Sequence, residues 1–242
     1  MTRFKIIEVA GHKRRERRDF ITAEFPLTVE LNLRKVADLA CTPRNLKDLV
    51  VGYLYTSGFI NSLEDLLSLR IERSRHQAVA ETRSPLSPVR SFRKKTRTQP
   101  GFFMKSENLF RLINRFQKVS AEYQRTGGTH SAALCSRNKI LFFREDLGRH
   151  NALDKVIGAA LLKKHDLSHK FILISSRIPS EILLKIVRSR ISLIASLGAP
   201  TDRAIKIARR ERITLIGFAR GNRFNIYSSA DRVKRDQRRS KT

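Results

Sequence analysis

Apolar residues in the first part of the chain follow two different periods. Over residues 20–36 they alternate with other residues, and this period of two predicts a half-buried strand or hairpin. Over residues 41–60 they recur at helical spacing, with Thr42 suited to the N-cap of a helix and Gly58 to its end. We therefore expect a smaller N-terminal α+β domain over residues 1–72.

The apolar pattern then fades and returns. Residues 73–100 hold basic residues among Ser, Thr and Pro with little acid to offset them, which is typical of a flexible basic loop. Residues 106–124 carry apolar positions at helical intervals after a serine suited to an N-cap, so they predict an amphipathic helix. This helix opens a larger domain over residues 101–231, and residues 232–242 form a charged tail.

The larger domain alternates short apolar runs with helical segments. Strands of this length, separated by helices of about a dozen residues, are typical of a layered α/β domain with a mostly parallel sheet. The predicted strands are residues 131–135, 139–143, 171–176, 191–196 and 213–219, and the predicted helices are residues 151–164, 179–189 and 201–210.

Composition narrows the class of protein. The 242 residues carry a net charge of +28, and such a field attracts polyanions: nucleic acid, anionic lipid, phosphate-rich cofactors or an acidic partner surface. The two cysteines have neither a zinc nor a redox spacing, which fits a reducing compartment. No segment is apolar enough to cross a bilayer and the first residues lack the apolar run of a signal peptide, so we expect a cytoplasmic protein without membrane contact.

A glycine pair lies between the amphipathic helix and the next predicted strand. Gly127 and Gly128 let backbone amides approach an anion, Thr126 supplies a flanking hydroxyl, and His130 closes the segment. A tight turn between helix and strand is the alternative, and a lone glycine pair does not decide between the two.

A second polar cluster follows a predicted strand and precedes a predicted helix. In an α/β sheet the carboxyl end of a strand is where ligands bind. Arg149 suits bidentate contact with a phosphate or a guanine edge, and Asp146 or Glu145 suits acceptance from ring N–H groups. Gly148 and His150 complete this candidate site. The alternative is a helix cap with surface salt bridges.

A third cluster follows the last predicted strand. Two arginines surround a Gly-Asn turn there, an arrangement suited to gripping phosphate. A β-hairpin turn explains the same segment and is compatible with that role. The candidate residues are Phe218, Ala219, Arg220, Gly221, Asn222 and Arg223.

Two histidines and a cysteine, His130, His150 and Cys135, raise the question of a metal. Zinc hydrolases of the deaminase type need an H-x-E pair and a P-C-x-x-C pair, which supply the ligands and the general acid or base. Neither pair occurs in the chain. We therefore expect hydrogen-bonding histidines and no metal site.

Three segments have sequences that are more specific than the requirements of ordinary turns would explain. They are TGGTHSAAL at residues 126–134, EDLGRHNALDKVIGAAL at 145–161 and APTDRAIKIARRERITLIGFARGNRFNIYS at 199–228. With further matches at residues 41–60 and 172–196, the chain resembles the FdhD/NarQ family over most of its length. The resemblance implies a cytidine-deaminase-like, three-layer α/β/α domain without the zinc site, a smaller N-terminal domain, and a homodimer.

The resemblance also implies a function. Members of the family take sulfur from a cysteine desulfurase and transfer it to the bis-guanine-dinucleotide molybdenum cofactor, which enables formate dehydrogenase activity. We therefore expect this cofactor as the ligand, with a guanine nucleotide able to bind in its place, and the dehydrogenase catalytic subunit and the desulfurase as partners. In the family the loop that matches residues 218–223 contacts the cofactor, so Arg149, Arg220 and Arg223 are the leading phosphate or guanine contacts.

One segment departs from the family pattern. Family members carry a C-x-x-C in a loop ahead of the glycine pair, and its thiolate accepts sulfur as a persulfide. Here Ser84 and Ser87 stand at those positions, and because a hydroxyl cannot hold a persulfide, no catalytic residue is assigned. We expect Cys135 in the core. Exposure of Cys41 at the start of a helix would lower its pKa, but we do not expect Cys41 to carry sulfur.

Two alternatives stay open. The missing C-x-x-C favours a chaperone that holds the cofactor or the apoenzyme without moving sulfur. The net charge and the arginine-rich loop suggest a nucleic-acid-binding protein. However, the chain has no Trp and that loop has only Phe92 for stacking, so nucleic acid is not the expected partner.

Overall fold

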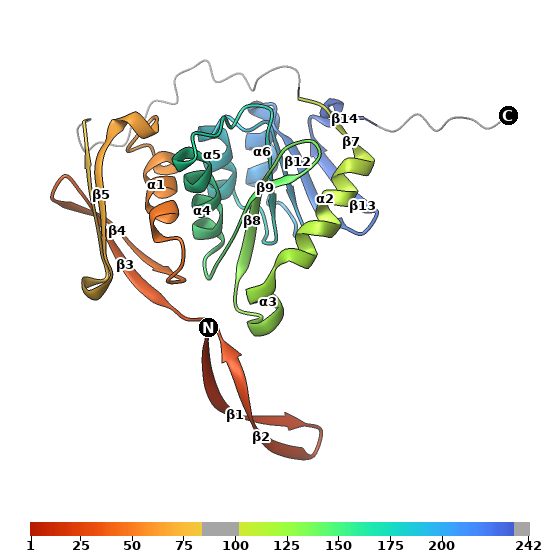
Figure 1. Cartoon of the computed structure of the whole chain (residues 1–242). Coiled ribbons are helices and arrows are strands. Elements are labelled where there is room, and N and C mark those ends of the chain that lie inside the picture. The colour runs from red at the N-terminus through yellow and green to blue at the C-terminus, as the bar shows by residue number, and fades with distance from the viewer. Residues whose placement is uncertain (84–101, 235–242) are drawn as a thin grey trace.

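The computed structural model describes residues 1–83 and 102–234, which form three bodies (Figure 1). A two-stranded hairpin extends from one end, a four-stranded sheet with one helix forms the N-terminal domain, and a six-stranded sheet with helices forms the larger domain. Ser84, Ser87 and most of the predicted basic loop lie outside the described residues. None of the helices in the described part of the chain is long and apolar enough to cross a membrane.

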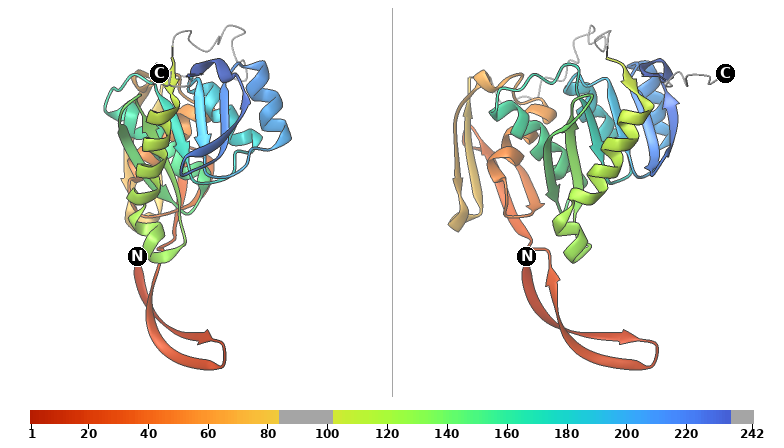
Figure 2. Two further views of the ribbon diagram at one scale, coloured as in Figure 1. Left: turned by 90° about the vertical axis from the view of Figure 1, so that its right-hand side faces the viewer. Right: turned by 45° about the vertical axis from the view of Figure 1, so that its right-hand side comes forward.

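The hairpin comprises β1 (Thr2–Ala10) and β2 (Lys13–Ile21), which pair antiparallel along their whole length. Gly11 turns the chain with a φ of 58°, in the left-handed region that glycine adopts without strain. Both views in Figure 2 show the hairpin projecting away from the rest of the molecule. Sequence reasoning did not separate it from the N-terminal domain, because charged residues interrupt its apolar alternation.

The N-terminal domain is built on a sheet with the strand order β4-β3-β6-β5. β3 (Phe25–Leu31) and β4 (Arg34–Cys41) form an antiparallel hairpin, which confirms the prediction from the period of two over residues 20–36. β6 (Gln77–Thr82) pairs parallel with β3 and antiparallel with β5 (Leu66–Glu72). The buried side chains of this sheet pack against a single helix.

Strand β6 corrects the domain boundary predicted at residue 72 and the loop predicted to begin at residue 73. Ala78 and Ala80 alternate into the core of the N-terminal domain. Their side chains are single methyl groups, so the alternation leaves only a weak hydrophobic signal in the sequence. The first part of the predicted basic loop is therefore a strand of the N-terminal sheet.

The helix of the N-terminal domain is α1 (Leu46–Ser57). It ends at Gly58, as predicted, with a φ of 88°. The predicted N-cap at Thr42 is wrong, because the N–H and hydroxyl of Thr42 donate to the Asp146 carboxylate at 3.0 and 3.2 Å. The helix begins only after Asn45, which has a φ of 55°.

The larger domain contains a six-stranded sheet with the order β13-β12-β11-β10-β8-β9. Its strands are β8 (His130–Cys135), β9 (Ile140–Asp146), β10 (Phe171–Ile174), β11 (Leu193–Ser196), β12 (Thr214–Arg220) and β13 (Arg223–Ser228). β10, β11 and β12 are parallel, but the other three neighbouring pairs are antiparallel, so the prediction of a mostly parallel sheet is wrong. The two outer pairs are joined by short turns, which permit antiparallel pairing alone.

Helices cover both faces of this sheet, in agreement with the predicted three-layer α/β/α arrangement. α4, α5 and α6 pack on one face and α2 packs on the other (Figure 1). The helix predicted over residues 106–124 is interrupted at Ser120. The helices are α2 (Ser106–Val119), α3 (Ala121–Thr126), α4 (Arg149–Leu162), α5 (Ser180–Arg188) and α6 (Asp202–Arg210).

Short elements complete the larger domain. β7 (Met104–Lys105) pairs parallel with β14 (Val233–Lys234), so the first residues of the predicted charged tail belong to a second, two-stranded sheet. The prediction that the domain ends at residue 231 is corrected accordingly. The single-turn 3₁₀ helix η3 (Ala230–Arg232) precedes β14, whereas the 3₁₀ helices η1 (Leu63–Asp65) and η2 (Arg73–Arg75) flank β5 in the N-terminal domain.

Helices α1 and α4 join the two domains by close backbone contact. Gly52 of α1 lies where a Cβ atom would overlap the carbonyl oxygen of Asp154, and a Cβ at Gly158 of α4 would overlap the carbonyl oxygen of Asp48. Glycine at both positions therefore lets the two helix backbones touch. This contact brings the N-terminal domain against the start of α4, where the second polar cluster lies.

Candidate functional site

The three segments predicted to carry chemistry meet at one edge of the six-stranded sheet. β10, β11 and β12 are parallel, so their carboxyl ends share this edge. His130 at the start of β8 pairs with Asp146 at the end of β9, which brings two of the segments to the same edge. Residues 126–130, 145–150 and 218–223 therefore lie where ligands bind in α/β sheets.

The glycine pair forms a turn that is closed by its own hydrogen bonds. Gly127 ends α3 with a φ of 65°, and the Gly128 amide donates to the Thr126 hydroxyl at 3.1 Å. Thr22, just after the N-terminal hairpin, donates to the same hydroxyl at 2.7 Å. Because the Gly128 N–H and the Thr126 hydroxyl are already engaged, the geometry favours the turn over an anion cradle.

Glu145 fixes this turn from the neighbouring strand. Its carboxylate accepts hydrogen bonds from the Ser120 hydroxyl at 2.7 Å, the Thr129 hydroxyl at 3.2 Å and the Tyr123 amide at 3.1 Å. The Ser120 hydroxyl and the Tyr123 amide belong to the start of α3, where unpaired backbone N–H groups favour a carboxylate. Glu145 is therefore a structural clamp between β9 and α3.

Asp146 has a different role from the predicted cofactor contact. Its side chain is fully buried, and Lys155 Nζ lies 2.5 Å from its Oδ2 atom. Oδ2 also accepts from Thr42, while Oδ1 accepts from the Gly148 amide at 3.1 Å and from Asn151 Nδ2 at 2.9 Å. Both oxygens of Asp146 and the Gly148 amide are therefore engaged inside the protein. They tie the N-terminal domain to α4.

Arg149, His150 and His130 lie half-buried beside this anchor. Within the described residues, Arg149 Nε and His150 Nε2 are buried without a hydrogen-bond partner, although His150 Nε2 lies 3.4 Å from a Glu181 carboxylate oxygen. Burial and then the charge of Arg149 lower the pKa of His130. Burial, then Lys185 and Arg149, lower the pKa of His150. An unpaired guanidinium N–H of this kind fits an anionic ligand, which would satisfy it.

The loop between β12 and β13 carries the most exposed candidates. β12 is irregular after Gly217, and Phe218 there has a φ of 51° and a 40% exposed side chain. A bulky residue rarely adopts the left-handed conformation, and such strain clusters at functional sites. Arg220 and Arg223 are exposed on either side of the turn at Gly221, whose φ is 55°. The loop thus presents an aromatic ring and two guanidinium groups to solvent.

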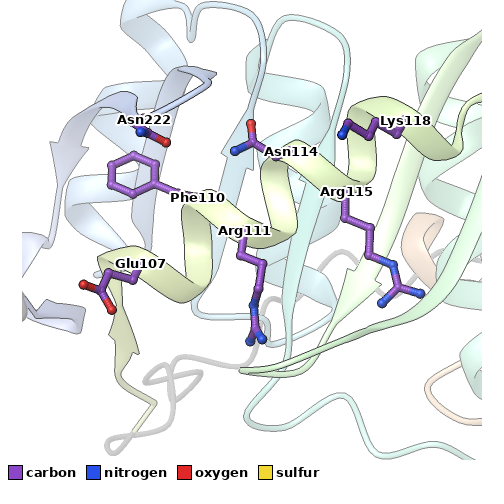
Figure 3. A pocket seen from close by; sticks show the side chains of 7 residues that line it. All are labelled: Glu107, Phe110, Arg111, Asn114, Arg115, Lys118 and Asn222. Carbon is purple, nitrogen blue, oxygen red and sulfur yellow. The ribbon is translucent and has the colours of Figure 1, made fainter.

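An open groove of about 650 Å³ adjoins this loop along α2 (Figure 3). Asn222 reaches the groove from the turn, whereas Ala219 is buried in the core. The other lining residues all come from α2: Glu107, Phe110, Arg111, Asn114, Arg115 and Lys118. Sequence reasoning missed the groove, although the helical spacing of its three cations was a visible signal.

Neither cysteine is an accessible thiol. Cys41 lies fully buried at the end of β4 and its Sγ donates to the Phe25 carbonyl at 3.3 Å, so it is not an exposed thiol at a helix start. Burial, and then the charge of Asp146, raise the pKa of the Cys41 thiol to about 12. Cys135 is buried in the core, as predicted, and burial raises its pKa strongly.

The histidines and Cys135 are not arranged around a metal. His130 begins β8 and Cys135 ends it, which separates them by roughly 17 Å in an extended strand. Among residues 1–83 and 102–234, no group of three or more His, Cys, Asp or Glu side chains could hold a metal ion.

Comparisons with known proteins agree with the resemblance in these segments. The model of the FdhD/NarQ family matches residues 22–234. The chain is similar to the sulfur carrier protein FdhD of Listeria monocytogenes, with 35% identity over 241 residues that cover 88% of this chain and 91% of that protein. It is also similar to the Bacillus subtilis protein of that name, with 34% identity over 238 residues that cover 89% and 91%. A crystal structure described as a formate dehydrogenase accessory protein, from Desulfotalea psychrophila, has a similar fold, with a TM-score of 0.83, 22% identity, and coverage of 96% of this chain and 99% of that chain.

Proposed function

The chain belongs to the FdhD/NarQ family, and from this premise we propose that it assists the maturation of formate dehydrogenase by binding the bis-guanine-dinucleotide molybdenum cofactor. That ligand is a bulky polyanion with two pyrophosphates and two guanine rings. A site for it needs cations for the phosphates and an exposed ring for stacking. The dehydrogenase apoenzyme is the proposed recipient, and the homodimer implied by the family resemblance is part of the proposal.

The loop between β12 and β13 is the observation that carries this proposal. Phe218 presents a ring on a strained backbone, which suits stacking on guanine. Arg220 and Arg223 follow within the same turn and suit bidentate contact with phosphate oxygens. Arg220 Nε donates to the Leu197 carbonyl at 3.3 Å, and this bond orients its guanidinium group.

Arg149 supports the same proposal from the other end of the edge. The Nε atom of Arg149 has no hydrogen-bond partner among the described residues, so it suits contact with an anion. His130, which lies near Arg149, is the first residue of β8. β8 and β12 are three strand spacings apart in the sheet, so His130 and Phe218 are separated by roughly 14 Å. A dinucleotide is long enough to contact both ends of such an edge.

GDP is a suitable probe, because it contains one guanine and one pyrophosphate. By titration calorimetry on the full chain, we expect Arg220→Ala/Arg223→Ala to weaken GDP binding about tenfold or more. The matched control is Lys163→Ala/Arg209→Ala, which removes two exposed cations at the ends of α4 and α6, on the opposite edge of the sheet. Unchanged affinity in the arginine variant would overturn the proposed site.

Buried thiols favour a second candidate function, in which the protein holds the cofactor without carrying sulfur. Both cysteines of the chain are fully buried, and the pKa of the Cys41 thiol is raised to about 12. Persulfide formation requires a thiolate that a desulfurase can reach. We therefore propose a holder role, in which a desulfurase does not transfer sulfur to either cysteine of this chain.

Persulfide mapping separates the holder from the carrier. The full chain is incubated with a cysteine desulfurase and cysteine, and each thiol is then analysed by alkylation and mass spectrometry. We expect no persulfide on the native chain and persulfide on a Ser84→Cys/Ser87→Cys variant, which rebuilds the C-x-x-C. Persulfide on Cys41 or Cys135 of the native chain would contradict the holder role and leave the cofactor site unaffected.

A further inference from the structure

The N-terminal hairpin lies outside everything assigned so far. The family match begins at residue 22, so it excludes both β1 and β2. The hairpin is a sheet of its own, and its main contact with the rest of the described chain is that of β2 with α3. It projects away from both domains (Figure 2). A two-stranded hairpin by itself is marginally stable in water, so a partner that extends its sheet would stabilise it.

The two faces of the hairpin differ in charge. On one face Glu8 pairs with Arg15 and Arg17, and Asp19 also pairs with Arg17, so ion pairs offset two of the three cations there, Lys13 being the third. The strand register places the following residues on the other face: Arg3, Lys5, Arg14 and Arg18, with Glu16 as the single acid. No ion pair joins any of these four cations to another residue in the described part of the chain. This cationic face is therefore free to meet external anions.

The two edges of the hairpin also differ. β2, with the sequence KRRERRDFI, holds five cations, and such density protects an edge against strand addition. β1, with the sequence TRFKIIEVA, holds two cations and exposes large apolar side chains. Phe4, Ile7 and Val9 are 53%, 56% and 62% exposed. β1 is therefore the edge that remains open to another strand.

We propose that β1 is a docking edge to which an extended, acidic segment of a partner protein adds as a third strand. Side chains on one face of a strand repeat about every 6.6 Å, so acids at alternate positions would oppose Arg3 and Lys5 one to one. The next positions on that face oppose Ile7 and Val9 and favour apolar residues. Main-chain hydrogen bonds provide affinity and the side-chain pattern provides selectivity. The inference does not depend on the cofactor site.

Other occupants fit this edge less well. The ring of Phe20 on the cationic face already contacts Arg3, whose guanidinium carbon is 4.6 Å from the ring centre, so that face has no free ring for base stacking. A second copy of the hairpin would bring four more cations to the same face and repel the first. An acidic protein segment satisfies both the charge and the open backbone edge.

A designed peptide tests the inference on the full-length protein. The probe carries valine at two alternate positions, glutamate at the next two, threonine between them and a fluorescent label, so that it matches β1 in antiparallel order. By fluorescence anisotropy we expect Arg3→Glu/Lys5→Glu to weaken binding about tenfold, and the matched Arg14→Glu/Arg18→Glu variant on β2 to weaken it less than about threefold. Hydrogen exchange of the β1 amides is expected to slow when the peptide binds.

Three outcomes would overturn this inference. Equal binding of a peptide N-methylated on the amides that face β1 would mean attraction by charge alone. Tighter binding of a single-stranded RNA or of phosphatidylglycerol vesicles, lost equally in both charge variants, would mean a general polyanion surface. A dimer that dissociates in the Arg3→Glu/Lys5→Glu variant, seen by sedimentation, would mean that a second copy occupies the edge. Circular dichroism and hydrogen exchange of both variants without peptide check that they keep the hairpin.

Discussion

The N-terminal domain and the larger domain differ sharply in charge. Residues 22–83 carry eight Lys and Arg against eight Asp and Glu, whereas residues 102–234 carry 26 against 10. The larger domain is also the one whose sheet edge presents Arg149, Arg220 and Arg223. A charge that served only solubility would have no reason to favour one domain. The contrast shows that the basic character belongs to the domain that carries the candidate ligand edge and not to the fold as a whole.

Buried and half-buried polar clusters hold the neutral domain against the basic one. Each cluster combines one residue of the N-terminal domain with side chains of the larger domain, so neither domain completes it alone. The clusters are Asp48 with Arg144 at 2.7 Å, Thr56 with Asp154 and Lys185, and Thr42 with Asp146 and Lys155. The first predictions therefore concern this joint.

The largest effect is expected from Lys155→Met. The substitution leaves the Asp146 carboxylate buried without its cation, so we expect the free energy of unfolding to fall by about 3–5 kcal/mol. Urea unfolding followed by circular dichroism measures it. An Asp146→Leu/Lys155→Met variant is the control, because it removes both charges and should recover part of the loss. A loss below about 1 kcal/mol in the single variant would show that the pair is not buried as described.

Gly158→Ala is expected to have the next largest effect. The added methyl group would overlap the Asp48 carbonyl oxygen in the neighbouring helix, so we expect a loss of about 1–3 kcal/mol in unfolding free energy. The sign of the change in unfolding free energy is decisive, because the same substitution in a solvent-exposed helix would raise that free energy by up to about 1 kcal/mol. A gain would mean that α1 and α4 do not touch at this position.

The contrast in charge can be tested directly through GDP affinity. Arg34→Ala/Arg70→Ala removes two exposed cations from the neutral domain, and we expect GDP affinity to change by less than about twofold. The same charge change at Arg220 and Arg223 is expected to weaken binding about tenfold. If calorimetry finds equal losses in the two variants, net charge and not the loop governs binding.

The smallest expected effect is a pH dependence from His130 and His150. Burial and neighbouring cations lower both pKa values in the folded state, so the unfolded chain takes up these protons first, near its ordinary value of about 6.5. The free energy of unfolding should therefore fall as pH falls from about 7 to 5.5. Urea midpoints across this range measure the effect, and a His130→Gln/His150→Gln variant should flatten it. An equal slope in that variant would assign the dependence to other groups.

Local periodicity in the sequence was enough to identify most elements of the larger domain and the helix that ends at Gly58. It also located the segments 126–130, 145–150 and 218–223, because strand ends in α/β sheets are marked by glycine and polar residues. The likeness to a family followed from the same segments. These features depend on residues close together in the chain, and a linear pattern records them directly.

Long-range pairing decided the rest. Three features join residues that are far apart in sequence. They are the parallel pairing of β6 with β3, the mixed strand order of the larger sheet, and the burial of Asp146 against Lys155 and Thr42. Phe218, whose backbone is left-handed, likewise donates its N–H to the carbonyl of the distant Gly198 at 3.0 Å. A carboxylate that the sequence presents as a ligand contact thus became an anchor, because burial is a property of the assembled layers and not of a segment.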